Sequence, residues 1–265
     1  MLKCCSLYSG SSGNCFFVQS QSAKILIDVG VSTKKIETAL QKQFNFNLTD
    51  ISAIFITHEH IDHTRSLFQI SEKYNIPVFA SKGTWNSLIK NENNIILEKN
   101  KKTFLLNKSF EFMDLRIYPF PTPHDAAEPC GFNIYNKNLK ISIATDIGHI
   151  NSDLFNNLKN SSFIMLESNY EPKMLKFSSY PYKLKQRIAS NDGHLSNIEA
   201  GETISKLVDY GLKDVLLVHL SKENNMPVIA YETVMENLKK NNNFSLESFN
   251  LDIAPRNNPS KIFNI

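Results

Sequence analysis

Four potential metal ligands, His58, His60, Asp62 and His63, lie within the six-residue run His58-Glu59-His60-Ile61-Asp62-His63. Crowded histidines are unfavourable because neighbouring imidazoles compete for hydrogen-bond partners and repel one another when protonated. A metal ion removes that cost by binding the neutral ring nitrogens. A solvated polar loop is the alternative. The run follows the apolar segment Ile51 to Thr57, and loops at strand ends direct side chains into clefts. We therefore predict a metal site.

The number of ligands favours two ions over one. His58 and His60 alternate and can face one ion, while Asp62 and His63 turn toward a second; a lone zinc ion would need only three or four such groups. The donors include no thiolate, which suits zinc, manganese or iron. The expected cofactor is therefore a pair of divalent metal ions, Zn²⁺ or Mn²⁺, with iron as a further possibility.

Three later residues complete the expected ligand set, and each follows a predicted strand. His124 comes after the strand ending at Phe120, Asp146 after Lys140 to Ala144, and His219 after Val215 to Val218. An aspartate at the end of a buried strand can bridge two cations with its two oxygens. Taken singly, each has an ordinary alternative as a surface histidine or a capping aspartate. Their recurrence at strand ends favours the metal interpretation.

His194 lies in Asp192-Gly193-His194-Leu195-Ser196, just before a predicted helix. Because the ligand set is complete without it, we assign His194 to phosphate contact and to protonation of a departing 3′ oxygen. An exposed loop histidine is the alternative. In a two-metal site the bridging water loses its proton near neutral pH and attacks in line. Asp62 would orient that nucleophile, so Asp62 and His194 are the predicted catalytic residues.

Short strands and helices alternate along the chain and must position these residues. The expected strands are Phe16 to Val18, Lys24 to Asp28, Ile51 to Thr57, Pro77 to Ala80, Glu111 to Phe120, Gly131 to Tyr135, Lys140 to Ala144, Phe163 to Leu166 and Val215 to Val218. The expected helices are Thr33 to Lys42, Leu67 to Tyr74, Thr84 to Lys90, Asp153 to Leu158, Ser196 to Tyr210 and Val228 to Lys239. Ser196 and Glu199 form a capping-box pattern at the start of the clearest helix. No linker interrupts the pattern, so we expect one α/β domain over residues 1–265, a four-layer αβ/βα sandwich.

Composition narrows the function without fixing it. The 265 residues are 42% hydrophobic and 21% charged, which is typical of a globular protein with a sizeable core. The net charge of +3 is too small to indicate nucleic-acid binding by itself. The four cysteines form no zinc-finger or disulfide pattern, and no apolar run approaches a membrane span. We expect a cytoplasmic protein with no membrane association and no obligatory protein partner.

The ligand pattern resembles that of the metallo-β-lactamase superfamily, in the same order along most of the chain. Further segments resemble its YycJ/WalJ branch: Ser9 to Asn14, Thr57 to His60, His124 to Pro129, Glu167 to Asn169, Gly193-His194, and His219 to Ser221 running to Asn224 to Met226. Members of that branch are described as 5′→3′ exonucleases on double-stranded DNA. The resemblance therefore implies DNA as the substrate. It also implies a histidine such as His194 before a helix, in contact with the scissile phosphate.

The resemblance assigns supporting roles to other residues. Asp28 and Glu167, each at a strand end, would steady the metal ligands. The expected substrate contacts are Ser11, Ser12 and Asn14 in the small-residue loop, Lys183, Lys185 and Arg187 in the basic stretch, and Ser196 and Asn197 at the start of the helix. A solvated face is the alternative explanation of the basic stretch. The chain has no insertion the size of the substrate-clamping arm typical of ribonuclease-type members, which makes tRNA processing a poorer fit.

Two other functions fit the same metal site. One is hydrolysis of a small ester, thioester, lactone or β-lactam, and the other is a metal-binding or oxygen-sensing scaffold without hydrolysis. His194, the basic stretch and the branch-level matches favour the nuclease over the small-molecule hydrolase. The complete ligand set, with room for a water, favours catalysis over the scaffold.

Overall fold

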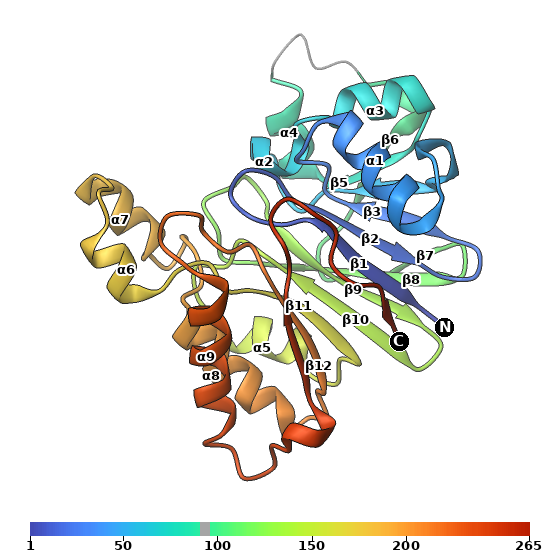
Figure 1. Ribbon diagram of the computed structural model, residues 1–265. Coiled ribbons are helices and arrows are strands. Elements are labelled where there is room, and N and C mark those ends of the chain that lie inside the picture. The colour runs from blue at the N-terminus through green and yellow to red at the C-terminus, as the bar shows by residue number, and fades with distance from the viewer. Residues whose placement is uncertain (91–95) are drawn as a thin grey trace. The chain divides into compact units, whose positions relative to one another are not determined.

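The computed structural model describes residues 1–90 and 96–265 and contains two compact units, each built on β-strands (Figure 1). The first unit comprises Met1–Pro121, Ala126–Cys130 and Pro255–Ile265, and the second comprises Thr122–Asp125 and Gly131–Ala254. The expectation of one domain over residues 1–265 stays a prediction.

The described strands are β1 (Lys3–Tyr8), β2 (Cys15–Gln19), β3 (Lys24–Ile27), β4 (Ala53–Phe55), β5 (Val78–Ser81), β6 (Lys101–Phe104), β7 (Phe110–Phe112), β8 (Leu115–Pro121), β9 (Cys130–Asn136), β10 (Leu139–Ala144), β11 (Phe163–Glu167), β12 (Asp214–Val218), β13 (Asn250–Ile253) and β14 (Phe263–Asn264). The described α-helices are α1 (Thr33–Phe44), α2 (Ile61–Thr64), α3 (Leu67–Tyr74), α4 (Lys82–Leu88), α5 (Ser152–Leu158), α6 (Pro172–Phe177), α7 (Tyr182–Ile188), α8 (Asn197–Val208) and α9 (Pro227–Leu238). None of the helices in these two ranges is long and apolar enough to cross a bilayer.

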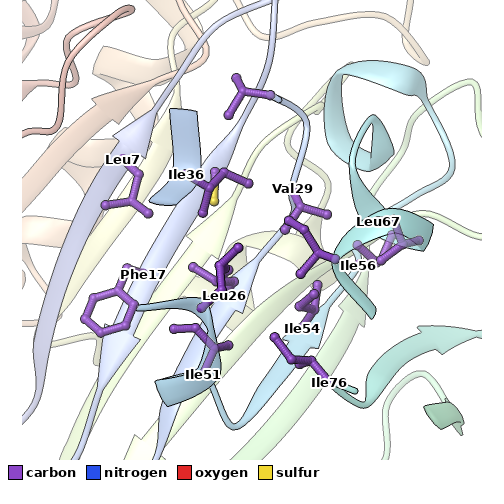
Figure 2. Close-up of a cluster of buried hydrophobic side chains, with 14 of the residues drawn as sticks. Leu7, Phe17, Leu26, Val29, Ile36, Ile51, Ile54, Ile56, Leu67 and Ile76 are labelled. Carbon is purple, nitrogen blue, oxygen red and sulfur yellow. The ribbon is translucent and has the colours of Figure 1, made fainter. Parts of the chain in front are cut away.

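The sheet of the first unit has the order β14-β1-β2-β3-β4-β5-β6. Strands β3 to β6 are parallel neighbours, so their carboxyl ends meet at one edge. One face of this sheet is apolar because alternate strand residues point the same way: Leu7, Phe17, Leu26 and Ile54 are all fully buried. Figure 2 shows them packed with Ile36 of α1 and Leu67 of α3 in one cluster. Helices α1 and α3 therefore pack on this apolar face of the sheet.

The second unit also contains a run of parallel strands. Strand β9 pairs antiparallel with β10, and β10, β11, β12 and β13 are parallel neighbours. The strands β11 and β12 are almost wholly buried, as the apolar runs Phe163 to Leu166 and Val215 to Val218 require. Helix α8 begins with the predicted capping box of Ser196 and Glu199 and packs against α9. Three parallel carboxyl ends, those of β10, β11 and β12, therefore meet at one edge of this unit.

Two predicted strands differ from the structure, each for a local reason. The segment Glu111 to Phe120 contains two antiparallel strands, β7 and β8, because Met113 adopts a left-handed conformation with φ of 56° and turns the chain. The segment Ile51 to Thr57 forms only the short β4. The Thr57 N–H and hydroxyl donate to the carboxylate of Asp28, so Thr57 leaves the strand ladder.

Candidate functional site

Strand ends hold predicted site residues in both units. Asp28 follows β3, while Asp146 and His219 follow β10 and β12. All three adopt left-handed backbone conformations, with φ of 61°, 58° and 57°. Such conformations are rare outside glycine, cost about 1–3 kcal/mol each, and cluster at functional sites where the surroundings enforce them. Three of the nine non-glycine residues with positive φ in the described ranges are therefore residues that the strand-end pattern predicts.

In the first unit, a fully buried carboxylate organises the histidine run. Asp28 accepts from Nδ1 of His63 at 2.7 Å and from the Thr57 hydroxyl at 2.8 Å. Burial raises the pKa of Asp28, and the neighbouring His63 opposes that rise. The Thr57 hydroxyl has one hydrogen, which it donates to Asp28. Its oxygen therefore accepts a hydrogen bond from Nδ1 of His58 at 3.0 Å. Both histidines are thereby held with Nε2 as the remaining nitrogen, which is the tautomer that binds a metal.

The other two members of the run lie beside these rings. The His60 ring centroid is 4.6 Å from that of His58, and the Asp62 carboxylate is 3.5 Å from Nε2 of His63. Helix α2 is one turn long and begins directly after His60, which places Asp62 and His63 in its first turn. The structure therefore brings all four predicted ligands of the first unit together.

A close backbone approach at Gly30 secures this arrangement. A Cβ added there would lie 1.6 Å from the Asp62 carbonyl oxygen, and the Asn14 N–H already donates to that oxygen at 2.8 Å. We expect Gly30→Ala to displace the loop, lower the free energy of unfolding by about 1–3 kcal/mol and reduce metal content. Urea unfolding and elemental analysis measure both effects.

Gly211→Asn is the matched control for Gly30→Ala. Gly211 has open space around its Cα and a φ of +83°, which asparagine tolerates better than most residues. We expect this variant to keep the metal content of the wild type. Equal metal content in Gly30→Ala and the wild type would contradict the proposed role of this contact.

In the second unit, Asp146 and His219 form a buried pair. Nδ1 of His219 lies 2.9 Å from Oδ2 of Asp146 and 2.8 Å from the Thr145 hydroxyl, which itself donates to Oδ2. His124 lies nearby, with Nε2 3.7 Å from Oδ1 of Asp146 and Nδ1 3.0 Å from the Gly193 carbonyl oxygen. Burial is the main cause that lowers the pKa of His124, which favours the neutral ring that a metal binds.

Glu167 and His194 form a second pair in the same unit. Oε1 of Glu167 accepts from Nδ1 of His194 at 2.8 Å, and Oε2 accepts from the Ile147 N–H at 2.6 Å. The Glu167 side chain is fully buried, whereas that of His194 is 20% exposed. The carboxylate thus orients the ring and leaves Nε2 of His194 as the nitrogen that can meet a substrate.

The donor sets fit divalent metal ions. In the second unit, one ligand atom each from Asp146, Glu167, His194 and His219 lies within 4.8 Å of the other three. In both units, Nδ1 of the buried histidines faces an oxygen, which fixes the tautomer and leaves Nε2 for coordination; these histidines are His58, His63, His124 and His219. Clusters of imidazole and carboxylate that are tied down in this way are typical of metal centres.

The residues expected to contact substrate fall into three structural groups. Ser11 and Ser12 are exposed, as are Lys183 and Arg187 of α7. Half-buried Lys185 donates to the Lys176 and Ser178 carbonyl oxygens, and Arg187 bonds to Asp125 at 2.5 Å. The three remaining residues are buried: Asn14, Ser196 and Asn197.

Each buried residue of this set has internal partners. The Asn14 amide lies 3.0 Å from Nε2 of His63, the Ser196 hydroxyl belongs to the capping box, and Asn197 bonds to Ser168 and Asn225. These contacts connect the small-residue loop to the histidine run and the helix start to β11.

Thr57 and Thr145 also belong to this arrangement, although neither is among the predicted site residues. Each relays a hydrogen bond from a histidine to an aspartate: Thr57 joins His58 to Asp28, and Thr145 joins His219 to Asp146. The available signal was position, since each threonine lies just before a predicted ligand at a strand end.

Comparisons with known proteins show the family and the fold of this chain. A family model described as a Beta-lactamase superfamily domain matches residues 23–220. The exodeoxyribonuclease YycJ of Bacillus anthracis is 34% identical over 97% of this chain and 96% of its own length. The exodeoxyribonuclease WalJ of Streptococcus pneumoniae is 35% identical over 88% of this chain and 86% of its own. The metallo-β-lactamase fold protein YhfI of Bacillus subtilis superposes over the full length of both chains with a TM-score of 0.71 and 14% identity. The predicted fold class is therefore confirmed: this is an α/β protein of the metallo-β-lactamase fold.

Proposed function

The chain belongs to the metallo-β-lactamase superfamily and, within it, to the group of YycJ- and WalJ-type enzymes, and from this premise we propose that it is an exonuclease that degrades double-stranded DNA in the 5′→3′ direction. It is a hydrolase by family, and its relatives are named exodeoxyribonucleases. The observation that carries the proposal is the Glu167–His194 pair. An oriented, partly exposed imidazole beside a metal-type donor cluster suits the protonation of a departing sugar oxygen.

The proposed metal ligands are the seven residues expected from the strand-end pattern. They are His58, His60, Asp62 and His63 in the first unit, and His124, Asp146 and His219 in the second. The proposed cofactor is a dinuclear centre of zinc or manganese, with iron as a further possibility. When bound, such ions lower the pKa of a water and offset negative charge on the phosphate.

The chain's own residues perform the remaining steps. Asp62, 21% exposed at the start of α2, would orient the attacking water. His194 would contact the phosphate and transfer a proton from Nε2 to the departing 3′ oxygen, while Glu167 holds its ring. Asp28 would keep His63 in its metal-binding tautomer.

The exposed cations of α7 would contact the DNA backbone. Lys183 is exposed and adjacent to Tyr182, and α7 ends six residues before His194. Such contacts are electrostatic, so binding should weaken as salt increases. A reducing, cytoplasmic location for this activity is part of the proposal.

Three substrates offered in parallel test the proposal. The full chain, loaded with Zn²⁺ or Mn²⁺, should release label from 5′-labelled duplex DNA, and a chelator should stop the release. Turnover of a thioester or lactone without degradation of DNA would replace the nuclease with a small-molecule hydrolase. Metal binding without turnover of any of them would indicate a non-catalytic scaffold.

A further inference from the structure

Helices α6 and α7 form a short hairpin in the second unit, drawn in gold in Figure 1. A cavity of about 380 Å³ opens between them. Its walls are largely apolar, formed by Tyr170, Pro172, Leu175 and Tyr182. Exposing two aromatic rings of one concave wall to water is unfavourable, so this pocket suits a flat, apolar group.

The two tyrosines differ in how firmly they are held. Tyr170 is 7% exposed and forms an isolated β-bridge with Ser196. Tyr182 is 74% exposed, so its ring is available for stacking. Burial is the main cause that raises the pKa of Tyr170 to about 12, which keeps its phenol neutral.

The hairpin is strongly basic. Residues 171–189 contain five cations, Lys173, Lys176, Lys183, Lys185 and Arg187, against one acid, Glu171. Lys176, Lys185 and Gln186 line the pocket together with the aromatic rings. An apolar, aromatic floor with lysines at its rim suits a nucleotide, whose base stacks while its phosphate meets a cation.

Backbone hydrogen bonds link the segments that form the pocket to the segment that contains His194. The His194 N–H donates to the Ile188 carbonyl oxygen at the end of α7, and the Asn169 N–H donates to the Leu195 carbonyl oxygen. Tyr170 lies three residues after Glu167, which is at most roughly 10 Å of chain. Stacked nucleotides in one strand rise about 3.4 Å each, so this distance spans at most about three of them.

We propose that this pocket binds one unstacked nucleobase of the substrate strand, a few nucleotides from the scissile phosphate. This inference rests on the proposed nuclease function and adds to it a site that binds a base at a fixed distance from the scissile phosphate. The base would stack on Tyr182 against the wall of Tyr170 and Leu175, while Lys176 and Lys183 meet the flanking phosphates. An enzyme holding such a base separates it from its neighbours before cleavage.

The test is a scan with abasic sites. Single-stranded oligonucleotides, each lacking the base at one position, are titrated into the full chain in the presence of a chelator, and fluorescence anisotropy gives the Kd. We expect one position to weaken binding on the order of tenfold in the wild type. In Tyr182→Ala the same abasic site should have no further effect, because the stacking partner is already gone.

Two variants act as controls. Phe177→Ala removes an aromatic ring that is 80% exposed but does not line the pocket, and it should bind like the wild type. Tyr182→Phe keeps the ring and should retain the scan's sensitive position. The proposed base-binding role of the pocket would be refuted, even if DNA is degraded, by either of two results. One is a scan in which no abasic position changes the Kd, and the other is an equal loss of DNA affinity in Tyr182→Ala and Phe177→Ala. Absence of both DNA binding and metal-dependent degradation would instead refute the nuclease proposal itself.

Discussion

His194→Ala should reduce degradation of duplex DNA by about 10²–10⁴-fold while leaving the metal content of the protein unchanged. The reason is that Nε2 of His194 is assigned to the departing oxygen, whereas Nδ1 is held by Glu167 at 2.8 Å. Initial rates on labelled duplex DNA measure the loss, and elemental analysis of the same preparation measures the metal.

His149 provides a matched control within the second unit. Its Nδ1 also bonds to an oxygen, the Asn191 carbonyl at 2.8 Å, but it belongs to none of the donor clusters found in the described ranges. His149→Ala should therefore keep both activity and metal. If His194→Ala loses metal along with activity, His194 is a ligand and not the proton donor.

Glu167→Gln separates positioning from proton donation. The amide keeps the shape of the side chain but loses the charge that stabilises a protonated His194 ring. We expect the pH at which activity falls on the alkaline side to move lower, because a neutral partner weakens the hold on the proton. An unchanged pH profile would mean that Glu167 does not act through His194.

Asp28→Ala should weaken metal binding by about 10–100-fold, although Asp28 itself is not an expected ligand. The carboxylate is the common acceptor for Thr57 and for Nδ1 of His63, and through Thr57 it fixes the tautomer of His58. Without it, two buried donors of Thr57 lose their partner, each at a cost of about 1–3 kcal/mol. Titration of the metal-free protein with Zn²⁺ measures the affinity, and urea unfolding measures the stability.

Asp28→Asn and Asp114→Ala sharpen this prediction. Asparagine can still accept from the Thr57 N–H, but its amide cannot accept from Nδ1 of His63, so metal affinity should fall more than stability. Asp114 accepts a hydrogen bond from Ser20 in the same unit, and Asp114→Ala should leave metal affinity intact. Equal metal affinity in Asp28→Ala and the wild type would show that the histidines need no carboxylate to orient them.

The clustering of the donor groups could be predicted from sequence because two strong rules coincide. The predicted ligands follow buried strands, and parallel strands end at the same edge of a sheet. Asp146, Glu167 and His219 therefore cluster in the second unit although they are far apart in sequence. The capping box at Ser196 was readable for a similar reason, since it depends only on residues three apart.

Features that depend on tertiary contacts could not be predicted from the sequence. Thr57 and Thr145 look like ordinary strand residues, and only the fold shows that they relay hydrogen bonds between histidine and aspartate. The hairpin of α6 and α7 was missed because its helices are six and seven residues long, too short for a clear periodic signal. The left-handed turn at Met113 could not be predicted because no glycine occupies that position.

A metal-reconstitution experiment on linear duplex DNA labelled at the 5′ end tests the proposed metal-dependent nuclease activity most directly. The protein is stripped with a chelator, dialysed and reloaded with Zn²⁺ or Mn²⁺, and the release of labelled mononucleotide is followed over time. We expect no release by the stripped protein and release from the 5′ end after reloading. Equal release with and without metal, or no release by a fully loaded protein, would contradict this expectation.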